Sequence, residues 1–214
     1  MMPHMFARFA LGAALLALAA PATAQDGVPP PRTDTVVLET ALGPITLEIA
    51  TEIAPLTAAN FLRYVEEKRF DGTKFYRAMR LEWGEQPSGL VQGGTQMDPE
   101  RIRDPIAHEP TTATGVTHTA GAISMARYAP GTATGDFSIL LSDMPGLDAD
   151  PAAEDADARA GFAAFGRVTG GMDVVQAIFD APTDPDKGEG WMKGQMLDEP
   201  VAILSARCTT CGGD

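Results

Sequence analysis

The sequence contains a succession of short strand-like segments interrupted by only two helical segments, and this order limits the folds that the chain can adopt. The expected strands span residues 35–40, 45–49, 74–78, 90–94, 121–126, 136–141, 162–168 and 200–207. Helical periodicity is confined to two segments, which begin near Pro55 and Gly171. Because these helices do not alternate regularly with the strands, the order disfavours a doubly wound sheet. It favours an antiparallel β-barrel or sandwich.

The first two strand segments predict an antiparallel hairpin. Residues 45–49 alternate apolar and polar, which places Ile45, Leu47 and Ile49 on one buried face. Leu42-Gly43-Pro44 lies between the two strands. The hairpin is therefore expected to contribute one face to the core.

A helix is expected directly after this hairpin. Pro55 suits the first helical turn. Ala58, Phe61, Leu62 and Val65 then recur at helical spacing and form one apolar stripe. A helix in this position could close one end of a barrel.

The N-terminal segment has the pattern of a secretory signal. Residues 1–24 combine a short region with Arg8, an apolar run from Phe9 to Ala20, and Ala22-Thr23-Ala24 before Gln25. The apolar run is short for a bilayer span, although an uncleaved anchor is the alternative. We expect cleavage after Ala24, a periplasmic or secreted protein, and no stable membrane insertion. Residues 25–33 contain three consecutive prolines and predict an extended tether before a domain spanning residues 34–207.

The net charge of the chain limits the kinds of ligand and macromolecule that it is expected to bind. The formal net charge is −13, which disfavours nucleic acid, because phosphates require a basic face. It also disfavours docking on anionic lipid. The charge suits neutral or basic ligands. We expect a monomer.

The C-terminal tail, residues 208–214, holds the only two cysteines, in the motif Cys208-Thr209-Thr210-Cys211. In an oxidising compartment this spacing predicts a small disulfide. A redox role is an alternative, but it requires a helix N-terminus or a cation to lower a thiol pKa, and no helical pattern follows. A zinc site needs about four ligands, and neither His108 nor His118 has ligand-like spacing to the cysteines. We expect no metal and no cofactor.

Motifs for covalent chemistry are missing from the sequence. It contains no G-x-S-x-G nucleophile elbow and no phosphate-binding glycine loop. No motif pairs His108 or His118 with a serine or cysteine.

The acidic segment 143–161 begins a calcium-like pattern at Asp148-Ala149-Asp150, but no twelve-residue loop follows. We interpret this segment as a solvated loop.

One pair of side chains remains as a candidate site. Residues 74–78 predict a strand with an outward-facing Arg77, and residues 90–94 predict a strand with Gln92 before a glycine turn. Brought together on a pleated surface, the two side chains can donate hydrogen bonds to one acceptor, such as an amide carbonyl.

Six segments in order resemble the cyclophilin family of peptidyl-prolyl isomerases. They are Ala54-Pro55 to Asn60-Phe61-Leu62, Phe75-Tyr76-Arg77, Gln92-Gly93-Gly94, Ile123-Ser124-Met125-Ala126-Arg127, Phe165-Gly166-Arg167-Val168 and Gly171-Met172-Asp173-Val174-Val175. The resemblance runs from about Thr35 to Ala206. It implies a mainly β fold, an eight-stranded antiparallel β-barrel capped by two α-helices. It also implies a proline site on the outer face of the barrel.

The resemblance further implies the residues of that site. The catalytic arginine corresponds to Arg77, and the substrate-binding positions correspond to Gln92, Leu90, Ala126, Phe137, Ser138, Phe162 and Leu147. Successive strand residues face opposite ways, so only one of Phe137 and Ser138 can line the pocket. In the family it is the second, which leaves Phe137 for the core.

Several positions depart from the family pattern. Tyr76 replaces a histidine, Gly89 a pocket phenylalanine, Asp136 a glutamine and Gly146 a tryptophan used by cyclosporin. The connector Arg80–Ser88 is longer than usual, and its Trp83 could replace a lost aromatic wall.

The expected function is isomerisation of X-Pro bonds during folding of exported proteins. Rotation about the prolyl amide crosses a barrier of ~18–20 kcal/mol without breaking a bond, so a nucleophile is unnecessary. An arginine that favours the twisted amide would suffice. One alternative is a non-catalytic peptide-binding or chaperone module on the same scaffold. Another is thiol redox activity at Cys208 and Cys211.

Overall fold

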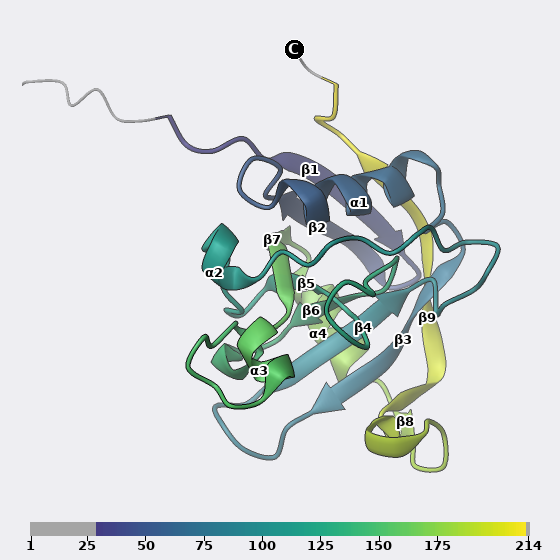
Figure 1. Ribbon diagram of the computed structural model, residues 1–214. Helices are drawn as coiled ribbons and strands as arrows, with labels where there is room; N and C mark the ends of the chain where they lie inside the picture. Colours follow the sequence, from purple (N-terminus) through teal and green to yellow (C-terminus); the bar gives the residue numbers. More distant parts are fainter. Residues whose placement is uncertain (1–28, 213–214) are drawn as a thin grey trace, which may run out of the picture. The chain divides into compact units, whose positions relative to one another are not determined.

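The computed structural model describes residues 29–212 and shows a closed antiparallel β-barrel (Figure 1). Eight strands close it in the order β1-β2-β7-β5-β6-β4-β3-β9, with β1 paired to β9. Their bounds are β1 Asp34–Thr40, β2 Gly43–Ile49, β3 Thr73–Arg80, β4 Gly89–Gly94, β5 Ala122–Met125, β6 Phe137–Leu140, β7 Ala163–Gly170 and β9 Met196–Cys208. A ninth strand, β8 (Thr183–Asp184), pairs only with β9. The predicted fold class is confirmed.

The predicted signal segment, residues 1–24, lies outside the described residues. The chain divides after Pro30, inside the predicted tether, and the barrel belongs to the second unit. Within residues 29–212, no helix combines the length and apolar character needed to cross a membrane.

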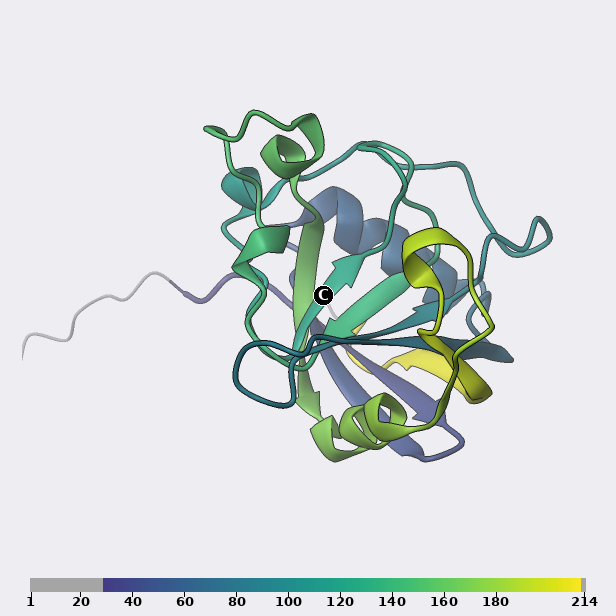
Figure 2. The same ribbon diagram turned by 90° about the horizontal axis from the view of Figure 1, so that it is seen from below.

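Helix α1 (Pro55–Glu66) and helix α4 (Met172–Asp180) pack on opposite sides of the barrel (Figures 1 and 2). Helix α1 contacts β7 and β9, whereas α4 contacts β2, β3 and β4. Ala58, Phe61 and Val65 of the predicted stripe are buried, and Leu62 is partly buried against the core. Two shorter helices that the sequence did not predict, α2 (Thr111–Thr114) and α3 (Ala156–Ala160), lie in the long loops.

The core is built from the inward faces of the strands and from the buried faces of α1 and α4. Ile45, Leu47 and Ile49 are fully buried, as the alternation predicts. The Phe61 ring contacts the rings of Phe70, Phe137 and Phe165 at centroid distances of 5.0, 5.3 and 5.2 Å, a range in which aromatic pairs attract. The helix is therefore fastened to the barrel by an aromatic cluster.

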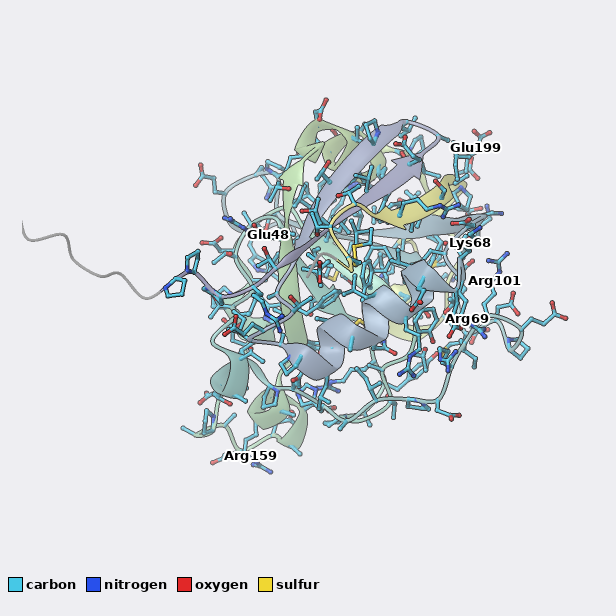
Figure 3. The ribbon with its side chains drawn as sticks, turned by 90° about the horizontal axis from the view of Figure 1, so that it is seen from above. Glu48, Lys68, Arg69, Arg101, Arg159 and Glu199 are labelled. Carbon is cyan, nitrogen blue, oxygen red and sulfur yellow. A yellow bond between two sulfur atoms is a disulfide. The ribbon has the colours of Figure 1, made fainter. Side chains whose placement is uncertain are left out.

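The loop from Thr95 to Pro110 is fastened to the C-terminal end of α1. The Arg69 guanidinium donates to the Arg101 carbonyl at 2.9 Å, and the Arg101 guanidinium donates to the Arg69 carbonyl at 3.0 Å. Figure 3 shows Lys68, Arg69 and Arg101 beside one another beyond this end of the helix. Cations at a helix C-terminus interact favourably with its dipole. This reciprocal pair holds a loop that has little secondary structure of its own.

The acidic segment 143–161 is more ordered than the predicted solvated loop. It contains a 3-10 turn, η1 (Pro145–Leu147), and α3. Asp155 caps α3 by accepting from the Ala158 backbone N–H at 2.9 Å. The Arg127 guanidinium donates to the Gly161 carbonyl at 2.7 Å. These contacts place Leu147 and Phe162 next to the outer face of the barrel.

Candidate active site

The site is built on one cross-strand row of the outer face. Arg77 on β3 faces Gln92 on β4, Gln92 faces Ser138 on β6, and Ser138 faces Ser124 on β5. In the next row, Phe75, Phe137 and Met125 belong to the core, and Gly93 lies between Phe75 and Phe137. Strand alternation thus separates polar site residues from core residues by one position.

A β-bulge modifies this pattern at the arginine. Phe75 is paired with Gly93 and Arg77 with Gln92, so Tyr76 is an extra residue on β3. A bulge re-aims side chains and is common beside active sites. Tyr76 and Arg77 consequently both line the outer pocket, although they are consecutive.

Arg77 is held by hydrogen bonds from two sides. Its Nη1 donates to Gln92 Oε1 at 2.6 Å. Its Nε and Nη2 donate to Gln195 Oε1 at 2.9 and 2.6 Å. Arg77 lies on the outer face of the barrel, yet it is only 3% exposed because Gln195 and Trp191 cover it. Burial lowers the pKa of the Arg77 guanidinium to about 10, so the group is still charged at neutral pH.

Behind Gln92 the hydrogen bonds continue into the protein. Gln92 Nε2 donates to the Tyr76 hydroxyl at 2.8 Å, and this hydroxyl donates to Asp136 Oδ1 at 3.3 Å. The Gln96 backbone N–H donates to the same Asp136 oxygen at 2.8 Å. Burial raises the pKa of the Tyr76 hydroxyl, with a further contribution from Asp136. Tyr76 therefore remains protonated and fixes the orientation of the Gln92 amide.

The row opens into a pocket of about 410 Å³. Seven of the eight predicted site residues line it, namely Arg77, Gln92, Leu90, Ala126, Ser138, Phe162 and Leu147. Its apolar wall combines Leu90 and Leu147 with Met79, which pack together, and with Phe162. A charged group beside an apolar wall is the arrangement of a small-ligand site.

The eighth predicted residue, Phe137, lies elsewhere. Its ring is fully buried in the core and contacts Phe61 and Phe75. The prediction that Phe137 lines the pocket is therefore wrong. The prediction from strand alternation, that Phe137 belongs to the core, is correct. Ser138, one position on, faces the pocket.

The segment before β9 contributes residues that the sequence did not predict. Trp191, in the 3-10 turn η2 (Gly190–Met192), stacks on the Arg77 guanidinium with 4.4 Å from Cζ to the ring centroid. Gln195 immediately precedes β9, and Met196, the first residue of β9, is paired with Arg77 in the sheet. The sequence around Trp191 and Gln195 has no periodicity that would predict a contact with Arg77. The contact depends on the pairing of β3 with β9, and Arg77 and Gln195 are 118 residues apart in the chain.

Comparison with known proteins agrees with this geometry. The family described as cyclophilin type peptidyl-prolyl cis-trans isomerase/CLD matches residues 35–207. This chain belongs to the cyclophilin family. Its enzyme class is therefore that of the peptidyl-prolyl cis-trans isomerases.

Curated relatives of this cyclophilin carry the same activity in their names. A peptidyl-prolyl cis-trans isomerase of Acinetobacter baylyi is 34% identical over 176 residues, which cover 80% of this chain and 84% of the relative. One of Streptomyces antibioticus is 34% identical over 177 residues, which cover 81% and 97%. A crystal structure of a cyclophilin type isomerase from Cryptosporidium parvum has a TM-score of 0.65 at 17% identity, covering 83% of this chain and 98% of that one. At that identity the structure supports the shared fold alone.

The structure explains one expected loss in this cyclophilin, at Gly89, and corrects one expected replacement, at Trp83. Gly89 has φ +139°, and a Cβ there would lie 1.9 Å from the Met79 carbonyl oxygen. In this backbone conformation a side chain at position 89 would clash with Met79 and point toward Phe179, so Gly89 is not an opening in the pocket wall. Trp83 does not replace an aromatic either, because the Arg80–Ser88 connector turns away and Trp83 is 70% exposed. Trp191 is the tryptophan that reaches the site.

The cyclophilin barrel also pairs His118 with a serine, which no motif had indicated. His118 Nδ1 lies 2.7 Å from Asp148 Oδ1, and Nε2 lies 2.8 Å from Ser124 Oγ. Burial lowers the pKa of the His118 imidazole, so the neutral ring donates to Asp148 and accepts from Ser124. Since both ring nitrogens are bonded, the trio fastens β5 to the pocket rim at Leu147. We assign it a structural role.

Cys208 is the last residue of β9, and it forms a disulfide with Cys211 in the tail. The Asp34 carboxylate is near both sulfur atoms. Disulfide sulfurs are not thiolate ligands, and zinc requires about four ligands. This cluster therefore does not form a zinc site in the oxidised protein.

Proposed function

We propose that this protein isomerises X-Pro peptide bonds through Arg77, without a covalent intermediate. The observation that carries the proposal is the charged Arg77, held in place at the edge of the apolar pocket. Three of the five guanidinium N–H groups are engaged by Gln92 and Gln195, which leaves one N–H on Nη1 and one on Nη2 for a ligand. A related structure from Cryptosporidium parvum was determined in the presence of the dipeptide Ala-Pro, which agrees with a proline ligand.

The chemistry required is modest. Uncatalysed prolyl isomerisation takes tens to hundreds of seconds because the amide C–N bond is partly double. In the twisted state the nitrogen lone pair leaves conjugation. A guanidinium beside the prolyl group then stabilises the twisted amide more than the planar one. The apolar wall excludes water, which strengthens this interaction.

The direct test is removal of the arginine. Arg77→Ala is expected to lower kcat/KM for a short X-Pro peptide by roughly 10²–10³-fold, the usual effect of removing one preorganised hydrogen-bond donor to the transition state. The measurement is cis/trans exchange of the peptide followed by NMR or a coupled assay. Arg167→Ala is the control, since Arg167 is an exposed arginine on β7, paired with Glu48. Circular dichroism should show that both variants fold.

A non-catalytic peptide-binding role is the second candidate. Ser138 and Asp136 favour it, because they replace an aromatic and a glutamine of the family pattern, and so make the pocket floor more polar. Equal and negligible exchange rates for the wild type and Arg77→Ala would eliminate the enzymatic proposal. Retained binding of an X-Pro peptide would then support the second candidate.

We propose further that the clients are exported polypeptides containing proline, and that the protein acts as a monomer after removal of residues 1–24. The signal pattern of that segment supports this placement. The disulfide supports it as well, because such bonds persist in oxidising compartments. The net charge of −13 favours neutral or basic clients over nucleic acid.

A further inference from the structure

We propose that Gln195 and Trp191 form a positioning device for Arg77, supplied by the segment between β8 and β9. The inference rests on the proposed role of Arg77 and adds two residues to it. Figure 2 shows this segment, in yellow-green, looping past β3. Neither residue belongs to the cross-strand row that builds the rest of the site.

Gln195 fixes one edge of the guanidinium. Its Oε1 accepts from both Nε and Nη2, at 2.9 and 2.6 Å. Its Nε2 donates to the Trp191 carbonyl at 2.9 Å. Because only the amide nitrogen can donate to a carbonyl, this second bond directs the amide oxygen toward Arg77. The guanidinium cannot rotate in its plane without breaking two hydrogen bonds.

Trp191 fixes one face. Its ring centroid lies 4.4 Å from Arg77 Cζ, a distance at which a cation and an indole ring attract. The side chain is 71% exposed, so burial in the core does not hold it there. Arg77 is thus confined by Gln195 at its edge and by Trp191 across its face.

The segment that carries both residues is itself anchored beside the arginine. The Ala78 backbone N–H donates to the Gln195 carbonyl at 2.9 Å, one position after Arg77. The Gly194 N–H donates to the Lys187 carbonyl at 2.9 Å, which closes the loop. Lys187 pairs with Asp184 and Asp198 at 3.3 Å each. The device therefore depends on local contacts and does not require a ligand to assemble.

The two holders determine which N–H groups of the Arg77 guanidinium stay available to a ligand, namely one on Nη1 and one on Nη2. With Gln92 on Nη1 and Gln195 on Nε and Nη2, the remaining pair is presented in one orientation. Preorganised donors contribute most to catalysis, since they need no reorganisation during the reaction. Loss of either holder should leave substrate binding in place but reduce turnover.

The experiment compares Gln195→Ala, Trp191→Ala and Trp191→Phe with the wild type. Gln195 is only partly buried and Trp191 is exposed, so the variants should fold. Gln195→Ala is expected to lower kcat roughly 10-fold, in line with the sensitivity of catalysis to small misplacements, with KM little changed. Trp191→Ala should lower kcat less, and Trp191→Phe should recover part of that loss.

Trp83 provides a matched control, because it is a tryptophan of nearly equal exposure that does not contact Arg77 in the described structure. Trp83→Ala is expected to leave kcat and KM unchanged. An increase in kcat for Trp191→Ala or Gln195→Ala would overturn the proposal and show that the segment obstructs the site. Unchanged kcat in both variants would overturn it as well.

A second readout does not depend on activity. The Nε–Hε signal of Arg77 in a nitrogen-15 NMR spectrum should be protected from exchange in the wild type and in Trp83→Ala. It should lose this protection in Gln195→Ala. If the wild type isomerises no peptide but shows the protected signal, the proposed function fails while the positioning contact stands. If the signal is equally unprotected in the wild type and Gln195→Ala, the positioning proposal itself fails.

Discussion

Asp136 illustrates how one buried carboxyl group supports the pocket wall. Its Oδ1 accepts from Tyr76 and from the Gln96 N–H. Gln96 and Met97 have positive φ values of 51° and 58°, a conformation that costs a non-glycine residue about 1–2 kcal/mol. The carboxylate helps to offset that cost. Its own burial outweighs these hydrogen bonds and raises the pKa of Asp136.

This raised pKa predicts a pH dependence of stability. The folded state binds the Asp136 proton more tightly than the unfolded state, whose pKa is near the ordinary value of 3.8. As pH rises from that value through the folded pKa, the free energy of unfolding therefore falls, by at most about 1.4 kcal/mol per pH unit. Asp136→Asn keeps the accepting oxygen but has no proton to lose. Urea unfolding of this variant should show a shallower decline across the same pH range.

The exposed Asp186 supplies the control for that measurement. Asp186→Asn should follow the wild-type dependence of the free energy of unfolding on pH. Parallel curves for Asp136→Asn and the wild type would show that Asp136 does not hold its proton more tightly in the folded state.

Among the elements, strand β6 has one face that packs in the core and one face that lines the pocket. Phe137 and Ser138 are adjacent, yet Phe137 joins the aromatic cluster and Ser138 lines the pocket. The same separation holds on β4, where Gly93 leaves room for the Phe75 ring, whose nearest atom would lie 2.8 Å from an added Cβ. A substitution on either face should affect one property and spare the other.

We therefore expect Phe137→Ala to lower the free energy of unfolding by about 3–5 kcal/mol, the usual effect of deleting a buried ring. Ser138→Ala should change it by less than about 1 kcal/mol, because little is removed from a position facing the pocket. Chemical denaturation of both variants measures the difference. Similar losses in the two variants would mean that the assignment of the two faces of β6 is wrong.

The bulge at Tyr76 is the second device at this scale. Without the extra residue, strand alternation would place Tyr76 and Arg77 on opposite faces. With it, Tyr76 supports Gln92 while Gln92 supports Arg77. Tyr76, which replaces the family histidine, therefore takes part in the site. Its hydroxyl accepts a hydrogen bond from Gln92 and donates one to Asp136.

In the whole molecule, the first and last strands of the barrel, β1 and β9, pair with each other and close it. We call this pairing the seam. Val36 faces Cys208 across the seam. Beyond it, the Thr209 N–H donates to the Thr35 carbonyl at 2.8 Å, and the Thr35 N–H donates to the Thr210 hydroxyl at 2.8 Å. The disulfide lies in this tail, so it restrains the segment that completes the closure.

Export and oxidation of this seam can be tested together. When the full chain is expressed in a bacterium with a periplasm, we expect the protein in that compartment to begin at Gln25. Its intact mass should also show the loss of the two thiol hydrogens of Cys208 and Cys211. Cys208→Ser is the control, since this variant should have the same N-terminus without an intramolecular disulfide. Recovery of the uncleaved chain from the cytoplasm would contradict the proposed export.

The local elements and the family could be predicted from the sequence alone. Alternation from Ile45 to Ile49 and the stripe of α1 are short-range patterns, so they could be predicted from neighbouring residues. The order of motifs indicated the barrel, and it identified Arg77 and seven further positions, of which Phe137 alone lies away from the pocket.

The contacts that hold Arg77 could not be predicted in this way, because they form between distant parts of the folded chain. The bulge at Tyr76 depends on the register between β3 and β4, and the contacts of Gln195 and Trp191 depend on the pairing of β3 with β9. Arg77 and Gln195 are 118 residues apart, so their contact depends on packing across the whole barrel and not on neighbouring residues. The bulge at Tyr76 likewise has no short sequence pattern of its own. For the same reason, the sequence pointed to Trp83 as the replacement aromatic, whereas the fold brings Trp191 to the arginine.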